Sequence, residues 1–158
     1  MKLDHPIDFA KHPQLRRATI ASLVDVPLLD SCFILGWGGN GTVYSDILQV
    51  ARYRLLSPDL CQKAESTFNQ LISLCGDGGS GTMRTAGAGG FGDPRACSGD
   101  DGGPLMCISK WDQDVEPFKL FGVISHSKEK CDSAQWNPTF FSSVTYYNGW
   151  IRWVMRNN

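Results

Sequence analysis

The sequence predicts a mainly β-stranded domain that ends in a helix, and three observations support this prediction. From residue 31 onward the 158-residue chain consists of short runs of β-branched and aromatic residues separated by glycines. Six cysteines occur without a Cys-x-x-Cys pair or clustered histidines, a pattern that favours disulfides over zinc. Residues 147–155 place apolar side chains at helical spacing. A chain of this length can bury one core, so we expect one domain.

The first strands and the first helix are expected between residues 32 and 74. The runs 32–38 and 47–54 are rich in β-branched and aromatic residues, and the second alternates in character as a half-buried strand does. Ser57-Pro58-Asp59 is typical of a helix start, because serine caps free amides and proline is tolerated in the first turn. We expect this helix to continue through residues 61–74, which are compatible with it.

Two further strands and a terminal helix are expected in the last third of the chain. Residues 118–125 form an apolar strand, and residues 140–144 form another. The helix that follows has one apolar face, which comprises Trp150, Ile151, Val154 and Met155. Such a stripe usually packs against a core, so we expect this helix to dock on the strands.

Charge and hydropathy argue against two classes of partner. The formal net charge of −1 provides no basic excess to neutralise phosphates, so we expect no nucleic-acid partner. No apolar run is long enough to span a bilayer, so we expect no membrane partner. Residues 1–20 lack the apolar stretch of a signal peptide, and we expect any export signal to lie outside this chain.

The most informative stretch lies between Cys97 and Cys107 and reads Cys-Ser-Gly-Asp-Asp-Gly-Gly-Pro-Leu-Met-Cys. Its glycines allow a sharp turn whose amide groups can point at one spot and hold an anion, although an isolated stretch of this kind is more often a surface turn. It resembles the nucleophile loop of the chymotrypsin/trypsin-like serine proteases, Gly-Asp-Ser-Gly-Gly-Pro-Leu. Further landmarks follow in the family's order: Gly36-Trp37-Gly38, residues 122–125, Asn137-Pro138 and Trp150-Ile151.

The resemblance implies an all-β fold, an antiparallel six-stranded Greek-key barrel with a C-terminal helix. Residues 31–158 correspond to the second of the family's two barrels, residues 1–30 to the inter-barrel connecting segment, and the first barrel is absent. The family's catalytic histidine and aspartate belong to that first barrel. His5 and His12 lie beside prolines in the polar connecting segment, without the family's alanine-histidine-cysteine context, so we expect them to be solvated.

The resemblance also selects a disulfide pairing, which cysteine counting alone leaves open among many. It pairs Cys32 with Cys107, Cys61 with Cys75, and Cys97 with Cys131. This pairing uses all six cysteines, which implies an oxidising, secreted or extracellular setting. The sequon at Asn40 fits that compartment as a glycan acceptor, although such tripeptides also arise by chance.

The residues that the resemblance assigns to catalysis depart from the family's pattern. Asp101 stands where the family has its nucleophilic serine, so three of the four catalytic parts are missing. The oxyanion amides fall at Gly99 and Asp101. An ionised Asp101 carboxylate repels a developing oxyanion, or folds back onto these amides. Asp100 matches the residue that pairs with the new N-terminal amine after activation, and its partner here is unknown.

The glycine-rich part of the chain raises two other chemistries, an aspartic-protease pair and a phosphate site, and the sequence favours neither. Asp100 and Asp101 are adjacent and tend to point apart, whereas an aspartic-protease pair needs two facing carboxylates from separate loops. The segment 76–96 contains eight glycines but no Gly-Lys-Ser/Thr, so we expect a flexible loop rather than a phosphate site. Neither a metal nor a cofactor is implied.

The specificity pocket implied by the resemblance is also altered. Its base falls at Arg95 and its walls at Ser127 and Thr139, where open-pocketed relatives carry glycine. His126 replaces a tryptophan of the substrate-binding strand. Side chains therefore occupy space meant for substrate. Arg95 either recruits an acidic group or is an ordinary solvated arginine.

Taken together, these departures predict a secreted, catalytically inactive serine-protease homologue that acts by binding. The rival interpretation is an active trypsin-like endopeptidase of which this chain is a partial or altered record, with Asp101 in place of serine. Without a first barrel, we expect a partly apolar seam lined by the Asp101 loop and residues 121–125. Such a surface predicts a protein or peptide partner, or self-association.

Overall fold

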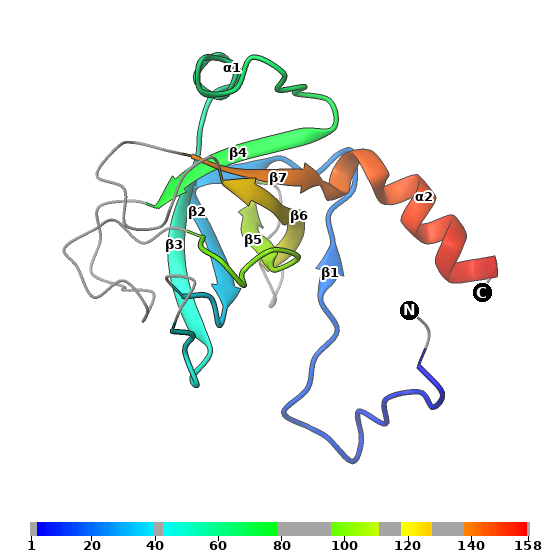
Figure 1. Cartoon of the computed structure of the whole chain (residues 1–158). Helices are drawn as coiled ribbons and strands as arrows, with labels where there is room; N and C mark the ends of the chain where they lie inside the picture. The colour runs from blue at the N-terminus through cyan, green and yellow to red at the C-terminus, as the bar shows by residue number, and fades with distance from the viewer. Residues whose placement is uncertain (1–2, 40–42, 79–95, 111–117, 128–137, 158) are drawn as a thin grey trace.

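The computed structural model describes residues 3–39, 43–78, 96–110, 118–127 and 138–157, without the side chain of Ser127 (Figure 1). The described part of the chain is built mainly of β-strands and ends in a helix. In chain order its elements are β1 (Thr19–Ile20), β2 (Pro27–Gly36), β3 (Gln49–Leu55), α1 (Pro58–Ala64), β4 (Ser73–Gly78), β5 (Pro104–Ser109), β6 (Phe118–Ser127), β7 (Thr139–Ser143) and α2 (Val144–Asn157).

Six of these strands close into an antiparallel barrel. Neighbouring strands follow the order β6-β5-β2-β3-β4-β7, and β7 pairs with β6 to complete the ring (Figure 1). β1 is an additional strand, which pairs with β6 in parallel register. The expected six-stranded barrel with a C-terminal helix is confirmed. Within the range expected to be a connecting segment, residues 19–20 form β1 and residues 27–30 already belong to β2.

The barrel core is built from the inward-facing side chains of its strands, and β3 and β5 show this as a regular alternation. In β3, Ala51, Tyr53 and Leu55 are buried, whereas the intervening side chains are exposed. A half-buried strand requires this pattern because successive side chains point to opposite faces. The main core cluster also contains Ile34, Leu105, Phe121, Ile124 and Phe141, which come from four other strands.

Two of the expected disulfides reinforce the barrel. Cys32 and Cys107 lie directly opposite each other on β2 and β5, with their Cα atoms 4.0 Å apart. Cys61 and Cys75 join α1 to β4 across 5.9 Å. Both pairings are confirmed. Cys97 is also disulfide-bonded, and its expected partner, Cys131, lies outside the described residues.

The first helix is shorter than expected. It ends at Ala64, because the next residue, Glu65, adopts an extended conformation with φ −138° and ψ 108°. Of the residues expected to be helical, Ser73 and Leu74 instead begin β4 (Ser73–Gly78), which pairs with β3 on one side and β7 on the other. Tertiary pairing outweighs the helical propensity of this segment.

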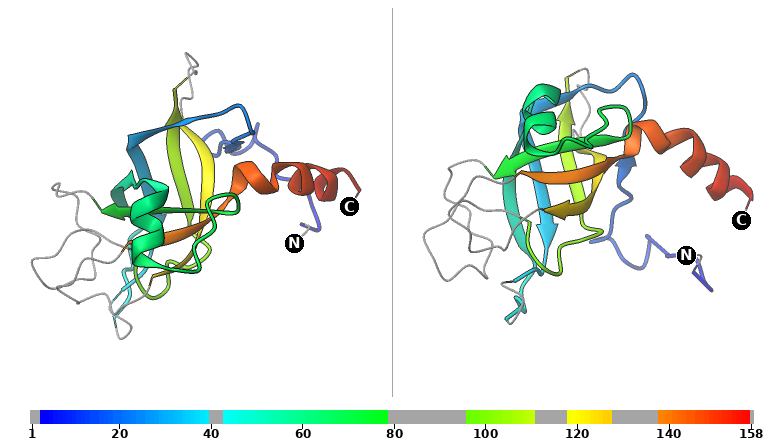
Figure 2. Two further views of the ribbon diagram at one scale, coloured as in Figure 1. Left: turned by 90° about the horizontal axis from the view of Figure 1, so that it is seen from above. Right: turned by 45° about the horizontal axis from the view of Figure 1, so that its top comes forward.

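The C-terminal helix docks through its first turns only. Val144 is buried, and Asn148 donates a hydrogen bond from Nδ2 to the backbone oxygen of Ala21 at 2.7 Å. Beyond this point α2 extends away from the barrel in every view (Figures 1 and 2). Trp150 and Met155 are 64% and 70% exposed. The expected apolar face therefore forms, but the expectation that it packs on the strands is wrong for these two residues.

Candidate functional site

The loop between Ala96 and Gly103 is organised by the side chain of Asp100. Its carboxylate is buried and accepts two backbone hydrogen bonds, from Gly38 N–H to Oδ1 at 2.8 Å and from Cys97 N–H to Oδ2 at 2.9 Å. A Cβ atom at Gly36 or Gly38 would overlap this carboxylate, which explains why the Gly-Trp-Gly segment needs both glycines. Within the described ranges, the Asp100 carboxylate thus has two amide partners, one three residues away in sequence and one 62 residues away.

Backbone contacts set the remaining shape of this loop. Gly99 and Gly102 have φ values of 92° and 82°, which side chains other than glycine rarely allow. Gly102 N–H donates to the oxygen of Ile124 at 2.9 Å, and Ile124 N–H donates to the oxygen of Gly103 at 2.8 Å. The loop is therefore held against β6. Its shape depends on glycine at positions whose conformation other residues would strain.

Residues 37–39 and 43–45 also include contacts with this loop. Gly39 N–H donates to the oxygen of Ser98 at 3.0 Å, and the two residues form an isolated β-bridge. The ring of Tyr44 lies so close to Gly99 that a Cβ atom there would come within 2.8 Å of it. The predicted oxyanion residue Gly99 thus lies beneath an aromatic ring that sequence reasoning did not identify.

Asp101 occupies the exposed tip of the loop. Among the described residues, no hydrogen bond joins its carboxylate to the amides of Gly99 or Asp101. The sequence left two behaviours open for the Asp101 carboxylate, which were repelling an oxyanion and folding back onto these amides. In the structure it does not fold back onto them. An exposed carboxylate therefore stands at the position that the resemblance assigns to the nucleophile, next to the amides that it assigns to an oxyanion hole.

None of the chain's three histidines hydrogen-bonds to the described residues of this loop. His5 and His12 are exposed in the N-terminal segment, as expected. His126 instead stacks on Phe140, with ring centroids 5.0 Å apart, and its Nε2 lies 3.4 Å from Oε2 of Glu65. Phe140 belongs to a second, smaller apolar cluster beside α1. His126 thus contacts that cluster.

The predicted pocket walls meet in the barrel. Ser127 on β6 lies opposite Thr139 on β7, and Thr139 is buried. The Thr139 hydroxyl hydrogen-bonds to the hydroxyl of Tyr53, which also accepts the Ala96 N–H. Sequence reasoning placed Tyr53 in a half-buried strand but gave no sign that its hydroxyl reaches this loop. Arg95 and Asn40 lie outside the described residues, as do residues 79–95 of the glycine-rich segment.

Two apolar residues of the 121–125 stretch, which was expected to line a seam together with the Asp101 loop, belong to the buried core. Phe121 and Ile124 are 1% and 3% exposed, because they point into the barrel core. In the described part of the chain, exposed apolar side chains are instead numerous on α2 and in residues 23–29. Others are Trp37, Val43, Tyr44, Ile47 and Leu48, between β2 and β3, and Phe118 on β6.

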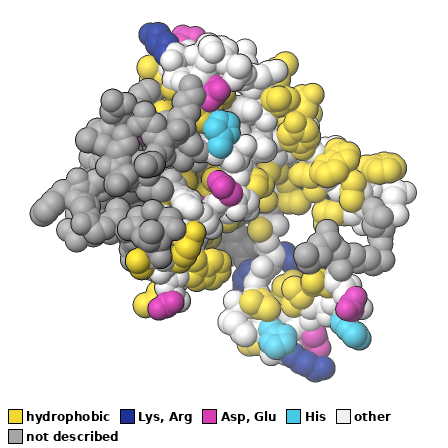
Figure 3. Space-filling view, in the orientation of Figure 1, with side chains coloured by type: hydrophobic (Ala, Val, Ile, Leu, Met, Phe, Trp, Pro, Cys, Tyr) yellow, Lys and Arg dark blue, Asp and Glu magenta, His cyan; other side chains and the backbone are white. Residues whose placement is uncertain are grey.

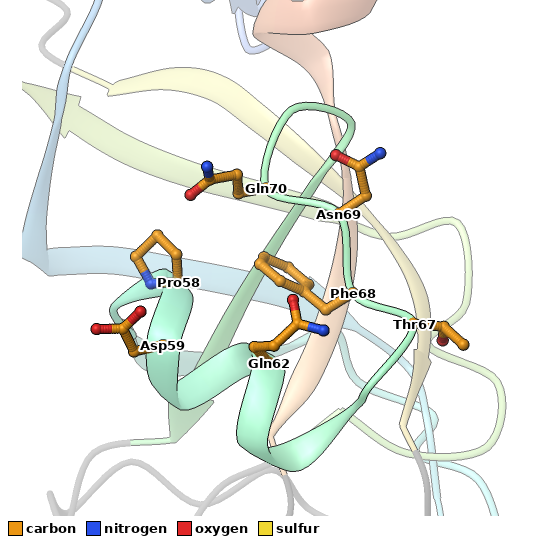
Figure 4. A pocket seen from close by; sticks show the side chains of 7 residues that line it. All are labelled: Pro58, Asp59, Gln62, Thr67, Phe68, Asn69 and Gln70. Atoms are coloured by element: carbon orange, nitrogen blue, oxygen red, sulfur yellow. The ribbon is translucent and has the colours of Figure 1, made fainter.

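An open cavity of about 540 Å³ lies away from this loop (Figure 4). It is formed by α1 and the segment that follows it, and its lining is mostly polar. The lining residues are Pro58, Asp59, Gln62, Thr67, Phe68, Asn69 and Gln70. None of the predicted site residues lines it.

Within the described ranges, no three His, Cys, Asp or Glu side chains are grouped so that they could hold a metal ion. Of the helices described, none has the length and apolar character needed to cross a membrane.

The closed barrel and the Asp100 loop are features expected of the family that the Cys97–Cys107 stretch resembles. A family model described as Trypsin matches residues 1–151. The chain belongs to the trypsin family. It is therefore a trypsin-like serine protease domain, and the resemblance carried by the Cys97–Cys107 stretch is confirmed.

Individual relatives in the trypsin family cover the chain to different extents. The thrombin-like enzyme BjussuSP-1 of Bothrops jararacussu is 27% identical over 96% of this chain, which spans 56% of that protein. The atrial natriuretic peptide-converting enzyme of Mus musculus is 32% identical over 76% of the chain and 9% of its own length. The chain spans about half the length of most of the curated relatives it matches first.

The fold is also shared with a solved structure of the family. Neuropsin, a serine protease expressed in the limbic system of mouse brain, superposes with a TM-score of 0.66. The alignment covers 90% of this chain and 55% of neuropsin, at 22% sequence identity. This likeness shows a common barrel fold.

Proposed function

We propose that this trypsin-like domain is a catalytically inactive serine-protease homologue that acts by binding. The observation that carries the proposal is the exposed carboxylate of Asp101 at the nucleophile position. In the family's mechanism a serine hydroxyl attacks the carbonyl after a histidine takes its proton. A carboxylate offers no such hydroxyl, and its charge opposes the oxyanion that the amides of Gly99 and Asp101 would have to stabilise.

The surroundings of Asp101 support the same conclusion. Among the described residues, no histidine hydrogen-bonds to Asp101, and His126 instead contacts Ser125 and Glu65. At the same time the Asp100 hydrogen bonds preserve the loop's shape. A loop that keeps its architecture while its reactive residue is replaced is suited to recognition rather than to chemistry.

The binding surface that we propose includes the outer face of α2. Tyr146, Trp150 and Trp153 are 51%, 64% and 62% exposed, and hydrophobic side chains gather over this helix (Figure 3). Aromatic residues, methionine and arginine are enriched in protein interfaces, whereas lysine, aspartate and glutamate are depleted. α2 contains tyrosine, tryptophan, methionine and arginine, and it contains no lysine, aspartate or glutamate. A protein or peptide partner, or a second copy of this chain, fits such a face.

The setting that we propose for this function is extracellular. The two disulfides that join described residues would not persist in a reducing compartment. A glycan at Asn40 belongs to the same proposal, which mass spectrometry of the secreted product would test.

The rival function is an active endopeptidase of which this chain is a partial or altered record. A fluorophosphonate probe separates the two, because it labels only an activated nucleophile. We expect no covalent adduct on the full-length natural product, measured by intact mass beside active trypsin as the positive control. An adduct that peptide mapping places in the Cys97–Cys107 stretch would refute the inactive assignment.

A further inference from the structure

The cavity beside α1 has the size and the composition of a small-ligand site. Its volume of about 540 Å³ falls within the range of about 300–1,000 Å³ that is typical of such sites. Phe68 contributes an aromatic ring to the lining, and Gln62 and Gln70 contribute amide groups. Figure 4 shows the ring between these two glutamine side chains, whereas Thr67 points away from it. The cavity thus places polar groups on either side of an aromatic surface.

The walls of this cavity are held in place by the smaller apolar cluster. The ring of Phe68 packs against Phe140 on β7, with ring centroids 6.1 Å apart. The disulfide between Cys61 and Cys75 joins α1 to β4, the two elements that flank the lining segment. Within that segment, Oδ1 of Asn69 accepts a backbone N–H two residues further on at 3.0 Å and so shapes the turn. A ligand would therefore meet a largely preformed site.

The fold already uses part of the polar lining, and most of what remains is acceptors. Gln62 donates from Nε2 to the backbone oxygen of Ser66, which leaves its Oε1 as an acceptor. Within the described ranges, the side chains of Asp59 and Gln70 form no hydrogen bond or ion pair. The Asp59 carboxylate offers acceptor oxygens only, and Gln70 offers an oxygen and an NH₂ group. A well-matched ligand must therefore donate more hydrogen bonds than it accepts.

Charge and hydrogen-bonding balance narrow the class of ligand. The lining contains no lysine, arginine or histidine that would neutralise a phosphate or a sulfate. Asp59 is its one charged residue, which is too few ligands for a metal ion. A peptide backbone carries one carbonyl for each N–H, so most of its carbonyls would lack donors here. Sugar hydroxyls can donate to the free oxygens, while the C–H face of a pyranose lies on the negative face of the Phe68 ring.

We propose that this cavity binds an uncharged sugar, such as the terminal unit of a glycan. Phe68 carries the sugar ring, and the oxygens of Asp59, Gln62 and Gln70 accept hydrogen bonds from its hydroxyl groups. The site lies away from the loop that contains Asp101, so it requires neither catalysis nor its loss. A fluorophosphonate adduct would refute the inactive function but would leave the sugar site standing.

Saturation-transfer NMR of the full, oxidised chain tests the ligand class. The neutral probes are methyl α-mannoside, methyl β-galactoside and N-acetylglucosamine, and arginine methyl ester is the cationic probe. We expect transfer to at least one neutral sugar, with its ring C–H protons receiving the most because they lie on Phe68, and less transfer to the cationic probe. Absence of transfer to all three sugars would overturn the proposal. Transfer to arginine methyl ester as strong as to any sugar would also overturn it, because Asp59 would then decide binding.

Variants test whether the sugar occupies this cavity. Gln70 is exposed and has no hydrogen bond to lose among the described residues, so Gln70→Ala should keep the fold. It should weaken sugar binding by about two- to tenfold, the effect of one net hydrogen bond. Phe68→Leu keeps an apolar side chain but removes the ring face, and transfer to the ring C–H protons should be lost.

The matched control is Gln14→Ala, which removes an equally exposed glutamine from the N-terminal segment. It should bind the sugar as the native chain does. Equal binding by Gln14→Ala and a folded Gln70→Ala would contradict the assignment to this cavity. Because Gln70→Ala leaves the apolar cluster untouched, this comparison decides the question even if Phe68→Leu does not fold.

Discussion

Replacing Asp100 by asparagine should destabilise the chain far more than the same replacement at its neighbour Asp101. Asp100 is 4% exposed, and its two carboxylate oxygens each accept a backbone N–H, from Gly38 and from Cys97. Asparagine has only one side-chain oxygen, so it can accept one of these bonds, and its NH₂ group would face the other N–H. Both hydrogen bonds lose their charged acceptor, and one of the two amides is left without any acceptor from this side chain.

The expected cost follows from those two changes. A hydrogen bond to a charged group contributes about 1.5–3 kcal/mol, and a buried donor without a partner costs about 1–3 kcal/mol. Relief from burying a charge offsets part of this loss. We therefore expect Asp100→Asn to lower the free energy of unfolding by on the order of 2–3 kcal/mol, a large share of the about 5–15 kcal/mol of a typical domain.

The matched variant Asp101→Asn controls for the change in charge. Asp101 is exposed and makes no hydrogen bond with the described residues, so this variant should stay within about 0.5 kcal/mol of the native chain. Urea unfolding of the oxidised chain, followed by fluorescence, measures both. Faster hydrogen exchange at the amides of Gly38 and Cys97 should accompany Asp100→Asn alone. Equal stability of the two variants would refute the anchoring role of Asp100.

Three further outcomes are expected. Although burial opposes ionisation of Asp25, hydrogen bonds from Lys119 and Ser22 outweigh it and hold the pKa of Asp25 below its ordinary value of 3.8. The stability that ionised Asp25 contributes is therefore complete above pH 3.8 and is lost as the pH falls below it. The variant Lys119→Met should weaken this acid dependence, measured in unfolding curves from pH 6 to pH 2. Non-reducing peptide mapping should recover Cys97 joined to Cys131, and any other partner would contradict the alignment to the family. Light scattering at rising concentration should show association that Trp153→Ala reduces, whereas a stable native monomer throughout would argue against self-association.

Sequence alone determined the family and therefore much of the fold. The Cys97–Cys107 stretch carries glycines at positions that need φ values near +90°, together with the carboxylate that orders the loop. These requirements are local, because a turn that only glycine can adopt can be recognised from neighbouring residues. The pairing of Cys32 with Cys107 followed from the same resemblance, and the strand register places these two residues opposite each other.

Local patterns failed where long-range pairing decided the outcome. Residues 61–74 are compatible with a helix, but the helix ends at Ala64 because the chain must enter β4 and pair with β3 and β7. The apolar stripe of α2 was recognised correctly, yet its periodicity could not show that the helix leaves the barrel after Asn148. Periodicity reports which face is apolar, but not what covers that face.

Only the tertiary structure showed how the site is held. The bonds from Gly38 N–H to Asp100, from Ala96 N–H to Tyr53, and between the hydroxyls of Tyr53 and Thr139 join positions 62, 43 and 86 residues apart. A sequence shows that a buried polar group needs a partner, but the partner's identity depends on which strands become neighbours. The aspartate at the position that the resemblance assigns to serine could be recognised from one motif, whereas the hydrogen bonds of the Tyr53 hydroxyl required the folded barrel.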